Sequence, residues 1–200
     1  LPKQNADIDL LLSDKNLIKI VVISSSLKSE LIRLHPNLRN KIQVHHDGAQ
    51  LRHEHNQLSP ASLGVPKTGE TKKFTGVYIG NLYPGKCMEE LVEFAPQLEG
   101  EVNFLIYGGQ EADVLRWRQM IASKSISNIQ LLGYLSPSEL FERIKNVDFF
   151  IAPFSQTVTQ GTGLDLTPWM SPLKIFEYMA LHRPIVCTDL PVIREVLKDD

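Results

Sequence analysis

The 200-residue sequence has few cysteines, no long apolar run and almost no net charge. Its two cysteines, Cys87 and Cys187, lie far apart, which argues against a disulfide framework and indicates reduced thiols in a cytosolic protein. The longest apolar run, residues 17–23, is short and is broken by Lys19, so no segment is long enough to span a bilayer. The net charge of −2 gives no electrostatic footprint for nucleic acid, which is therefore not an expected partner.

Several catalytic and cofactor motifs are also absent. No Gly-x-Gly-x-x-Gly follows the first strand of the main α/β region, which makes an NAD(P) oxidoreductase a poor candidate. The Gly-x4-Gly-Lys-Ser/Thr pattern of a P-loop is missing, as are a Gly-x-Ser-x-Gly elbow and a Cys/His pair at a recognisable spacing. The sequence therefore gives no support for a P-loop or for a hydrolase triad.

Histidines and carboxylates gather in one polar stretch and raise the question of a metal site. These residues are His45, His46, Asp47, His53, Glu54 and His55. The stretch has no cysteine and no helical His-x3-His arrangement, both of which are common features of metal sites. We therefore expect solvated histidines and no metal.

A segment rich in Pro, Gly and Ser, residues 58–69, divides the chain into two parts of different character. Such a composition is typical of a linker or a long loop, and we place it at residues 61–73. Residues 1–60 indicate a strand over 18–24, a helix capped by Ser26 and a second strand over 42–44.

Residues 74–200 alternate apolar strands with amphipathic helices. Strands are predicted at 76–80, 102–107, 129–132, 148–152 and 184–188, and helices at 86–95, 111–123, after Ser136, after Ser171 and at 192–198. Ser136, Pro137 and Glu139 form a capping-box signature. This alternation predicts a doubly wound α/β domain, a parallel sheet with helices on both faces. Ligands of such folds bind at the carboxyl ends of the strands, where we therefore look for the site.

The predicted helix after Ser171 carries the most informative group of side chains. Its free N–H groups and positive dipole end can hold a phosphate. Glu177 lies six residues further on, about 9 Å along the axis, where a carboxylate can accept hydrogen bonds from both hydroxyls of a ribose. The alternative is that Lys174 and Glu177 form an ordinary i,i+3 surface pair. On the other side of the helix, Leu173, Phe176 and Ala180 are expected to pack on the sheet.

Other loops at strand ends are candidates with equally good structural explanations. The loop from Gly80 to Lys86 places a lysine at a helix start, where it opposes the dipole unless an anion binds; otherwise it is an ordinary turn with a solvated lysine. Gly108 permits a close approach of ligand to backbone, or simply makes a tight turn. Tyr134 and Leu135 could contact a base. The long loop over 155–170 could cover a bound sugar.

These stretches together resemble the C-terminal half of the group 1 glycosyltransferases, the large family 4 of retaining GT-B enzymes. Residues 171–197 resemble the most specific block of that family, and residues 76–82 with Lys86 resemble its first strand and phosphate loop. The strands between are matched by residues 128–135 and 148–153. Parts of residues 22–48 resemble the end of the acceptor-side domain and the crossover. The order and spacing of the stretches, over nearly the whole chain, carry the resemblance.

The resemblance implies an enzyme that transfers a sugar, with retention, from a UDP- or GDP-sugar to a glycan or lipid-linked acceptor, as in polysaccharide or lipopolysaccharide synthesis. It implies no cofactor and no essential metal. By analogy, Lys86 holds the diphosphate and Glu177 the ribose, and both are candidate catalytic residues. Ser171 and nearby backbone meet a phosphate, with Lys174 as a helper. The predicted nucleotide-sugar-binding residues are Gly80, Asn81, Lys86, Gly108, Tyr134, Leu135, Ser171, Leu173, Lys174 and Glu177.

The resemblance also implies an organisation into two domains. Residues 1–60 correspond to the end of the acceptor-side domain and the crossover, and residues 74–200 to the Rossmann-like domain that binds the donor. We expect the chain to be part of a longer protein, able to bind the donor but not to catalyse transfer alone, because Leu1 is not a natural start and the family continues past Asp200. The parent enzyme is expected in the cytoplasm, in contact with the inner face of the membrane.

Two departures from the family pattern leave a second function open. The family often has an arginine at the position of Asn81, and the first glutamate of its Glu-x7-Glu motif falls on Trp169. Both departures favour a sugar-nucleotide-binding protein with little transferase activity. A third possibility is an α/β interaction module without a ligand, in which Lys86 and Glu177 are plain surface residues.

Overall fold

A computed structural model of the chain describes residues 6–50, 73–83, 88–155, 165 and 167–198. The chain divides into two compact units. The terminal unit comprises Leu1–Gly48, Gln156–Leu173 and Asp189–Asp200, and the sheet unit comprises Ala49–Ser155 and Lys174–Thr188. The predicted linker lies outside the described residues except for Lys73, so the domain boundaries drawn from the sequence stay a prediction.

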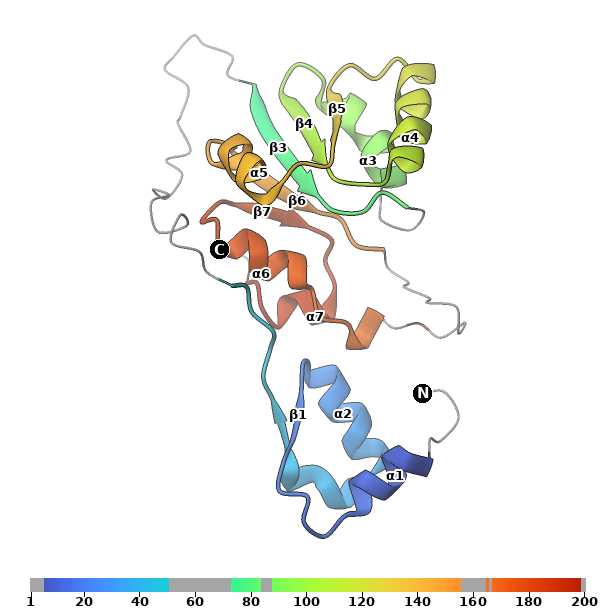
Figure 1. Cartoon of the computed structure of the whole chain (residues 1–200), viewed down its shortest axis with the longest axis vertical. Helices are drawn as coiled ribbons and strands as arrows, with labels where there is room; N and C mark the ends of the chain where they lie inside the picture. Colours follow the sequence, from blue (N-terminus) through green and yellow to red (C-terminus); the bar gives the residue numbers. More distant parts are fainter. Residues whose placement is uncertain (1–5, 51–72, 84–87, 156–164, 166, 199–200) are drawn as a thin grey trace. The chain divides into compact units, whose positions relative to one another are not determined.

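The sheet unit is built on five parallel strands. They are β3 (Phe74–Ile79), β4 (Val102–Tyr107), β5 (Ile129–Gly133), β6 (Phe149–Ala152) and β7 (Ile185–Cys187). Their order in the sheet is β5-β4-β3-β6-β7, and every pair is parallel. The chain therefore runs outward from β3 to β5, crosses back, and continues on the other side of β3 with β6 and β7 (Figure 1).

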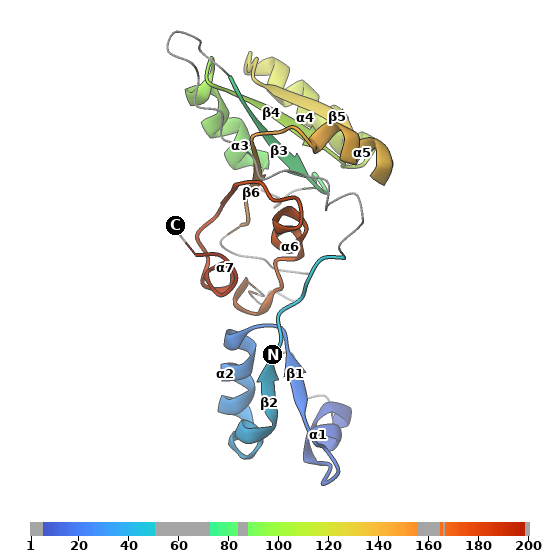
Figure 2. The same ribbon diagram turned by 90° about the vertical axis from the view of Figure 1, so that its left-hand side faces the viewer.

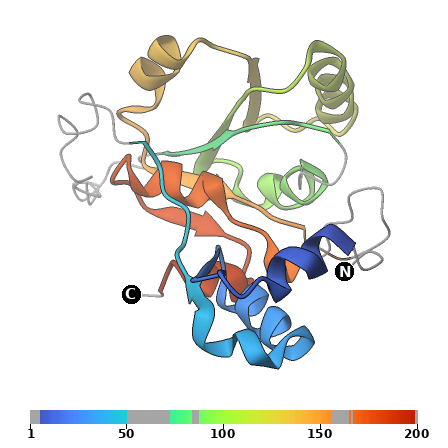
Figure 3. The same ribbon diagram turned by 60° about the horizontal axis from the view of Figure 1, so that its bottom comes forward.

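Helices cover both faces of this sheet. They are α3 (Met88–Phe94), followed by the 3-10 helix η3 (Ala95–Leu98), α4 (Glu111–Ser123), α5 (Pro137–Ile144) and α6 (Leu173–Met179). Figure 2 shows α3 and α5 on opposite sides of β3, and Figure 3 shows α4 in yellow-green and α5 in gold on opposite sides of the strands. Right-handed crossovers place α3 and α4 on one face of the sheet and α5 and α6 on the other. The predicted doubly wound α/β fold is thus confirmed.

The face under α3 and α4 holds the main hydrophobic core. Its buried residues are Tyr78, Leu82, Met88, Leu91, Val92, Ala95, Val102, Phe104, Ile106, Val114, Trp117, Ile121, Ile129, Leu131 and Ile151. Alternate residues of β4 point into it, because successive side chains of a strand point to opposite faces of the sheet. No helix in the described part of the chain is long and apolar enough to cross a membrane.

Two predictions for the helices of this region, the start of α5 and the buried face of α6, have different outcomes. At α5 the capping box is confirmed, because Ser136 Oγ accepts the Glu139 N–H at 3.4 Å and a Glu139 carboxylate oxygen accepts the Ser136 N–H at 3.1 Å. At α6 the predicted buried face is only partly confirmed: Ala180 is buried and Phe176 is half-buried, but Leu173 is 55% exposed, whereas Ile175 and Tyr178 are fully buried. Packing on the sheet, rather than the apolar spacing that we chose, decides which side chains of α6 are buried.

The terminal unit contains a small parallel sheet with helices around it. Its elements are α1 (Ala6–Ser13), β1 (Ile20–Val22), α2 (Ser25–Leu34), the 3-10 helix η1 (Pro36–Lys41), β2 (Ile42–Val44), the 3-10 helix η4 (Thr167–Trp169) and α7 (Pro191–Arg194). The predicted strand–helix–strand is found, with Ser24 rather than Ser26 as the helix cap: Ser24 Oγ accepts the Leu27 N–H at 3.1 Å. Helix α1 was not predicted.

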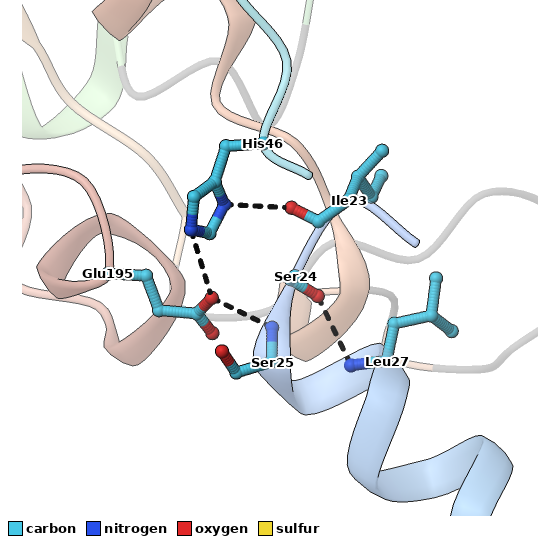
Figure 4. A network of polar contacts seen from close by, with 6 residues as sticks. All are labelled: Ile23, Ser24, Ser25, Leu27, His46 and Glu195. Carbon is cyan, nitrogen blue, oxygen red and sulfur yellow. Dashed lines mark hydrogen bonds and ion pairs between the residues drawn. The ribbon is translucent and has the colours of Figure 1, made fainter. Parts of the chain in front are cut away.

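The residues after α7 belong to this unit through Glu195. One carboxylate oxygen of Glu195 accepts the N–H of Ser25 at 2.8 Å and lies 3.8 Å from Nε2 of His46 (Figure 4). The other ring nitrogen of His46, Nδ1, lies 3.0 Å from the carbonyl oxygen of Ile23. A carboxylate at the first N–H of a helix interacts favourably with the helix dipole. Glu195 therefore joins the last described segment of the chain to the start of α2.

We expect Glu195→Ala to expose the Ser25 amide, because it removes the acceptor of that N–H. Hydrogen exchange at Ser25 should become about tenfold faster, the effect of losing one charge-assisted hydrogen bond. Glu195→Gln is the matched control, since its amide oxygen can still accept the bond. An unchanged exchange rate in Glu195→Ala would mean that Ser24 alone holds the start of α2.

Candidate functional site

The carboxyl ends of β3, β4 and β5 form an edge of backbone with few side chains. The N–H of Gly80 donates to the carbonyl of Tyr107 at 3.0 Å, and the N–H of Gly108 donates to the carbonyl of Gly133 at 2.7 Å. These bonds continue the sheet one residue beyond β3 and one residue beyond β4. Glycine at all three of these strand ends leaves the peptide groups accessible to a ligand.

Gly108 is required by the shape of this edge. A Cβ atom at this position would lie 2.3 Å from the carbonyl oxygen of Gly80, and the φ of Gly108 is +103°. The first fact is a collision with backbone and the second a conformation that side chains strongly disfavour. The two loops can therefore approach each other only because residue 108 has no side chain.

Two buried aromatic residues hold the loop that follows β3. The Tyr78 hydroxyl donates to the carbonyl of Asn81 at 2.9 Å, and the indole N–H of Trp117 donates to the carbonyl of Leu82 at 2.8 Å. The side chain of Leu82 is fully buried, whereas Asn81 is exposed. The loop thus begins in a fixed conformation. Lys86, predicted to hold a diphosphate, lies outside the described residues.

Lys174 reaches this loop from α6. Its ammonium lies 3.7 Å from the centroid of the Tyr78 ring. It also lies 2.9 Å from the point that a Cβ of Gly80 would occupy, so it sits against the backbone at the end of β3. A cation over an aromatic ring is held there by the ring quadrupole. The structure thus brings together three predicted site residues, Gly80, Gly108 and Lys174.

Glu177 follows Lys174 on the exposed side of α6. Among the described residues no ion pair joins Glu177 to Lys174, so the surface pairing that the spacing also allowed is not formed. The next residue, Tyr178, is buried and its hydroxyl contacts the backbone of Ile79 in β3. Burial raises the pKa of Tyr178, which keeps the hydroxyl protonated.

The remaining predicted residues occupy different surroundings. Tyr134 directly follows Gly133 at the end of β5 and is 78% exposed, with Leu135 half-buried beside it in the chain. Ser171 and Leu173 fall in the stretch that packs with the terminal unit. The hydroxyl of Ser171 is buried without a hydrogen-bond partner in the described part of the chain.

The metal candidates are only partly visible. In the described residues no group of three or more His, Cys, Asp or Glu side chains could hold a metal ion. His46 instead contacts the carbonyl of Ile23 and the carboxylate of Glu195. His53, Glu54 and His55 lie outside the described residues.

Sequence reasoning missed the residues that position the site. Tyr78 and Trp117 fix the loop after β3, and Tyr178 ties α6 to β3, but none of them was predicted to do so. The only available signal was the spacing of Lys174 and Tyr178, which are four residues apart and therefore share a face of the helix.

A family model described as "Glycosyl transferases group 1" matches residues 73–200. No curated protein matches the sequence. Among solved structures, a glycosyltransferase from Rickettsia africae aligns over 98% of this chain and 51% of its own, with a TM-score of 0.68 and 19% identity. HepE from Anabaena, solved with UDP and glucose, aligns over 100% of this chain and 52% of its own, with a TM-score of 0.62 and 15% identity.

The lipopolysaccharide outer core galactosyltransferase WaaB, in its apo form, aligns over 91% of this chain and 46% of its own, with a TM-score of 0.62 and 17% identity. At such identities the likeness shows the fold: the sheet unit has the Rossmann-like architecture of GT-B proteins. The chain spans about half the length of these structures, between 46% and 52%.

We expect Gly108→Ala to destabilise the sheet unit much more than Gly133→Ala. Both glycines have positive φ, +103° and +74°, but a Cβ at Gly133 would meet nothing within 4 Å. Gly133→Ala should therefore cost about 1 kcal/mol for its backbone conformation alone. Gly108→Ala should cost at least about 3 kcal/mol, because the collision with Gly80 adds an overpacking penalty. Urea unfolding of both variants measures the difference, and equal losses would contradict the close approach of the two loops.

Proposed function

The chain belongs to the group 1 glycosyl transferases, and from this membership we propose that it binds a nucleotide-diphosphate sugar as the donor of a sugar transfer. The proposed site is the carboxyl edge of the five-stranded sheet. The observation that carries the proposal is the pairing of an edge bare of side chains, at Gly80 and Gly108, with the ammonium of Lys174 beside Gly80. A polyanion can approach such backbone closely and be neutralised there by the cation.

The diphosphate is assigned to the β3 end of this edge. Lys174 would neutralise it together with Lys86, and the peptide groups of Gly80 and Asn81 would accommodate its oxygens. When the bond to the sugar breaks, negative charge grows on the departing diphosphate, so a fixed cation there lowers the barrier. Ser171 remains a proposed phosphate contact, with Leu173 beside it in the chain.

The nucleoside is assigned to residues on the exposed side of the same edge. The carboxylate of Glu177 can accept hydrogen bonds from both ribose hydroxyls, and its exposure leaves it available for this role. The exposed ring of Tyr134, with Leu135, would lie against the base. UDP is the first candidate because HepE was solved with UDP. GDP is the second, since no described contact distinguishes the bases.

The reaction is proposed to be transfer with retention, without an essential metal, to a glycan or lipid-linked acceptor. That acceptor would be bound by an acceptor-side half, equal in length to the part of the solved structures that this chain does not cover. Synthesis of polysaccharide or lipopolysaccharide in the cytoplasm, at the inner face of the membrane, would suit such a protein. WaaB is named as a lipopolysaccharide galactosyltransferase, which supports this setting as a proposal.

A second candidate is a sugar-nucleotide-binding protein with little transferase activity. Asn81 is neutral where the family often has an arginine, and Trp169 stands where it has a glutamate. Both candidates bind the donor, so hydrolysis separates them: a transferase releases free sugar from its donor slowly without an acceptor. Release of glucose from UDP-glucose by the intact gene product would favour the transferase.

We expect calorimetric titration of this chain with UDP, GDP and ADP to show binding of one nucleotide. Glu177→Ala should weaken that binding by about 1–3 kcal/mol, because a buried or partly buried hydroxyl pair loses its charged acceptor. Glu142→Ala is the matched control, since Glu142 is an exposed carboxylate on α5 that pairs with Lys145, the residue after the helix. If none of the three binds at millimolar concentration, or if both substitutions have the same effect, the donor-site proposal is wrong.

A further inference from the structure

β3 loses its neighbour on one side before it ends. On the β4 side it is paired along its whole length, from Phe74 to Ile79. On the other side, β6 is in register with β3 only at Gly76 and Val77. This divergence lies where the order of the strands reverses, and in such sheets ligands bind at the crevice that opens there. The last peptide of β3 therefore needs a partner other than a strand.

The hydroxyl of Tyr178 is that partner. It accepts the N–H of Ile79 at 2.9 Å and lies 3.4 Å from the carbonyl oxygen of the same residue, to which it can donate. The phenol is 1% exposed, and its ring stacks on Phe150 of β6 with the ring centroids 4.4 Å apart. A buried peptide N–H without an acceptor is strongly destabilising, so this contact is a strong restraint. Tyr178 thus bridges β3 and β6 where their backbones separate.

The opposite end of the same strand edge is closed in a comparable way. The carboxylate of Asp148 accepts the N–H of Thr75 at 2.8 Å, and the Asp148 N–H donates to the carbonyl of Thr75 at 3.1 Å. Asp148 therefore supports β3 at its amino end, away from the glycine edge. Asp148 and Tyr178 can therefore be compared. Both side chains accept a backbone N–H of β3, but of these two only Tyr178 does so near the proposed site.

Lys174 lies one helical turn before Tyr178 and on the same face of α6. Its ammonium is placed against the backbone of Gly80, the residue that directly follows Ile79. The bond from Tyr178 to Ile79 therefore connects the helix that carries the cation to the strand end that the cation faces. A lysine side chain has many rotamers, so its position depends on how firmly its helix is held.

We propose that Tyr178 is a positioning residue, whose hydroxyl holds α6 so that the Lys174 ammonium stays at the Gly80 peptide and meets the diphosphate of the ligand. This inference rests on the proposed function. It assigns to Tyr178 a part in diphosphate recognition that is separate from packing, because the ring and its stacking on Phe150 do not need the hydroxyl.

A double-mutant cycle tests this assignment. The wild-type chain, Tyr178→Phe, Lys174→Met and the double variant are titrated with UDP and GDP, each compared with its nucleoside. Tyr178→Phe should weaken the diphosphate about fivefold, as expected for one lost hydrogen bond, and should change nucleoside binding less than about twofold. In the Lys174→Met background, Tyr178→Phe should have almost no further effect on the diphosphate, because the cation that it positions is gone.

Asp148→Ala is the control for general loosening of β3. It should lower the thermal midpoint at least as much as Tyr178→Phe, and it should leave the ratio of nucleoside to diphosphate affinity unchanged. If the effects of Tyr178→Phe and Lys174→Met are additive, or if Asp148→Ala changes the same ratio, Tyr178 has only a structural role and the inference fails. If the wild-type chain binds neither diphosphate at millimolar concentration, the proposed function fails and this inference with it.

Discussion

A buried peptide group must find a hydrogen-bond partner, and at the centre of this sheet that requirement decides how the strand ends are built. β3 is the central strand, yet its partner β6 follows it only at Gly76 and Val77. Side chains complete the edge that β6 leaves open, Asp148 at one end and Tyr178 at the other. Near its carboxyl end, β3 is therefore completed by a buried phenol rather than by a strand.

Few side chains are present where the loops after β3 and β4 approach each other, and this absence is required by the geometry. Where the loops after β3 and β4 meet, the carbonyl of Gly80 occupies the space that a Cβ of Gly108 would need. Two buried aromatic residues, Tyr78 and Trp117, donate hydrogen bonds to the carbonyls of Asn81 and Leu82 in the loop after β3. A ligand at this edge would meet rigid backbone. Recognition of a phosphate by peptide groups needs that rigidity, since flexible groups lose entropy on binding.

Local signals in the sequence predicted the elements, and tertiary contacts decided the rest. The strand at 102–107 and the helix at 111–123 were predicted with their observed bounds, because apolar periodicity and flanking turn residues act over short distances. The capping box at Ser136 is equally local. The buried face of α6 was predicted only in part, since Ala180 is buried as expected but Leu173 is exposed and Tyr178 is buried. No spacing rule reports that a phenol will take the place of a strand as the partner of a peptide group 99 residues away in the chain.

The position of the cation follows from these constraints. Asn81 is uncharged and supplies no cation to the loop after β3, whereas the ammonium of Lys174 reaches the end of β3 from α6. A cation on a loop moves with the loop, whereas a cation on a helix moves with the helix and with everything that the helix contacts. Lys174 lies over the Tyr78 ring, and its helix is bonded to Ile79 through Tyr178. Both contacts end on β3, so the charge and the backbone it faces share one rigid element, which is the preorganisation that binding a diphosphate requires.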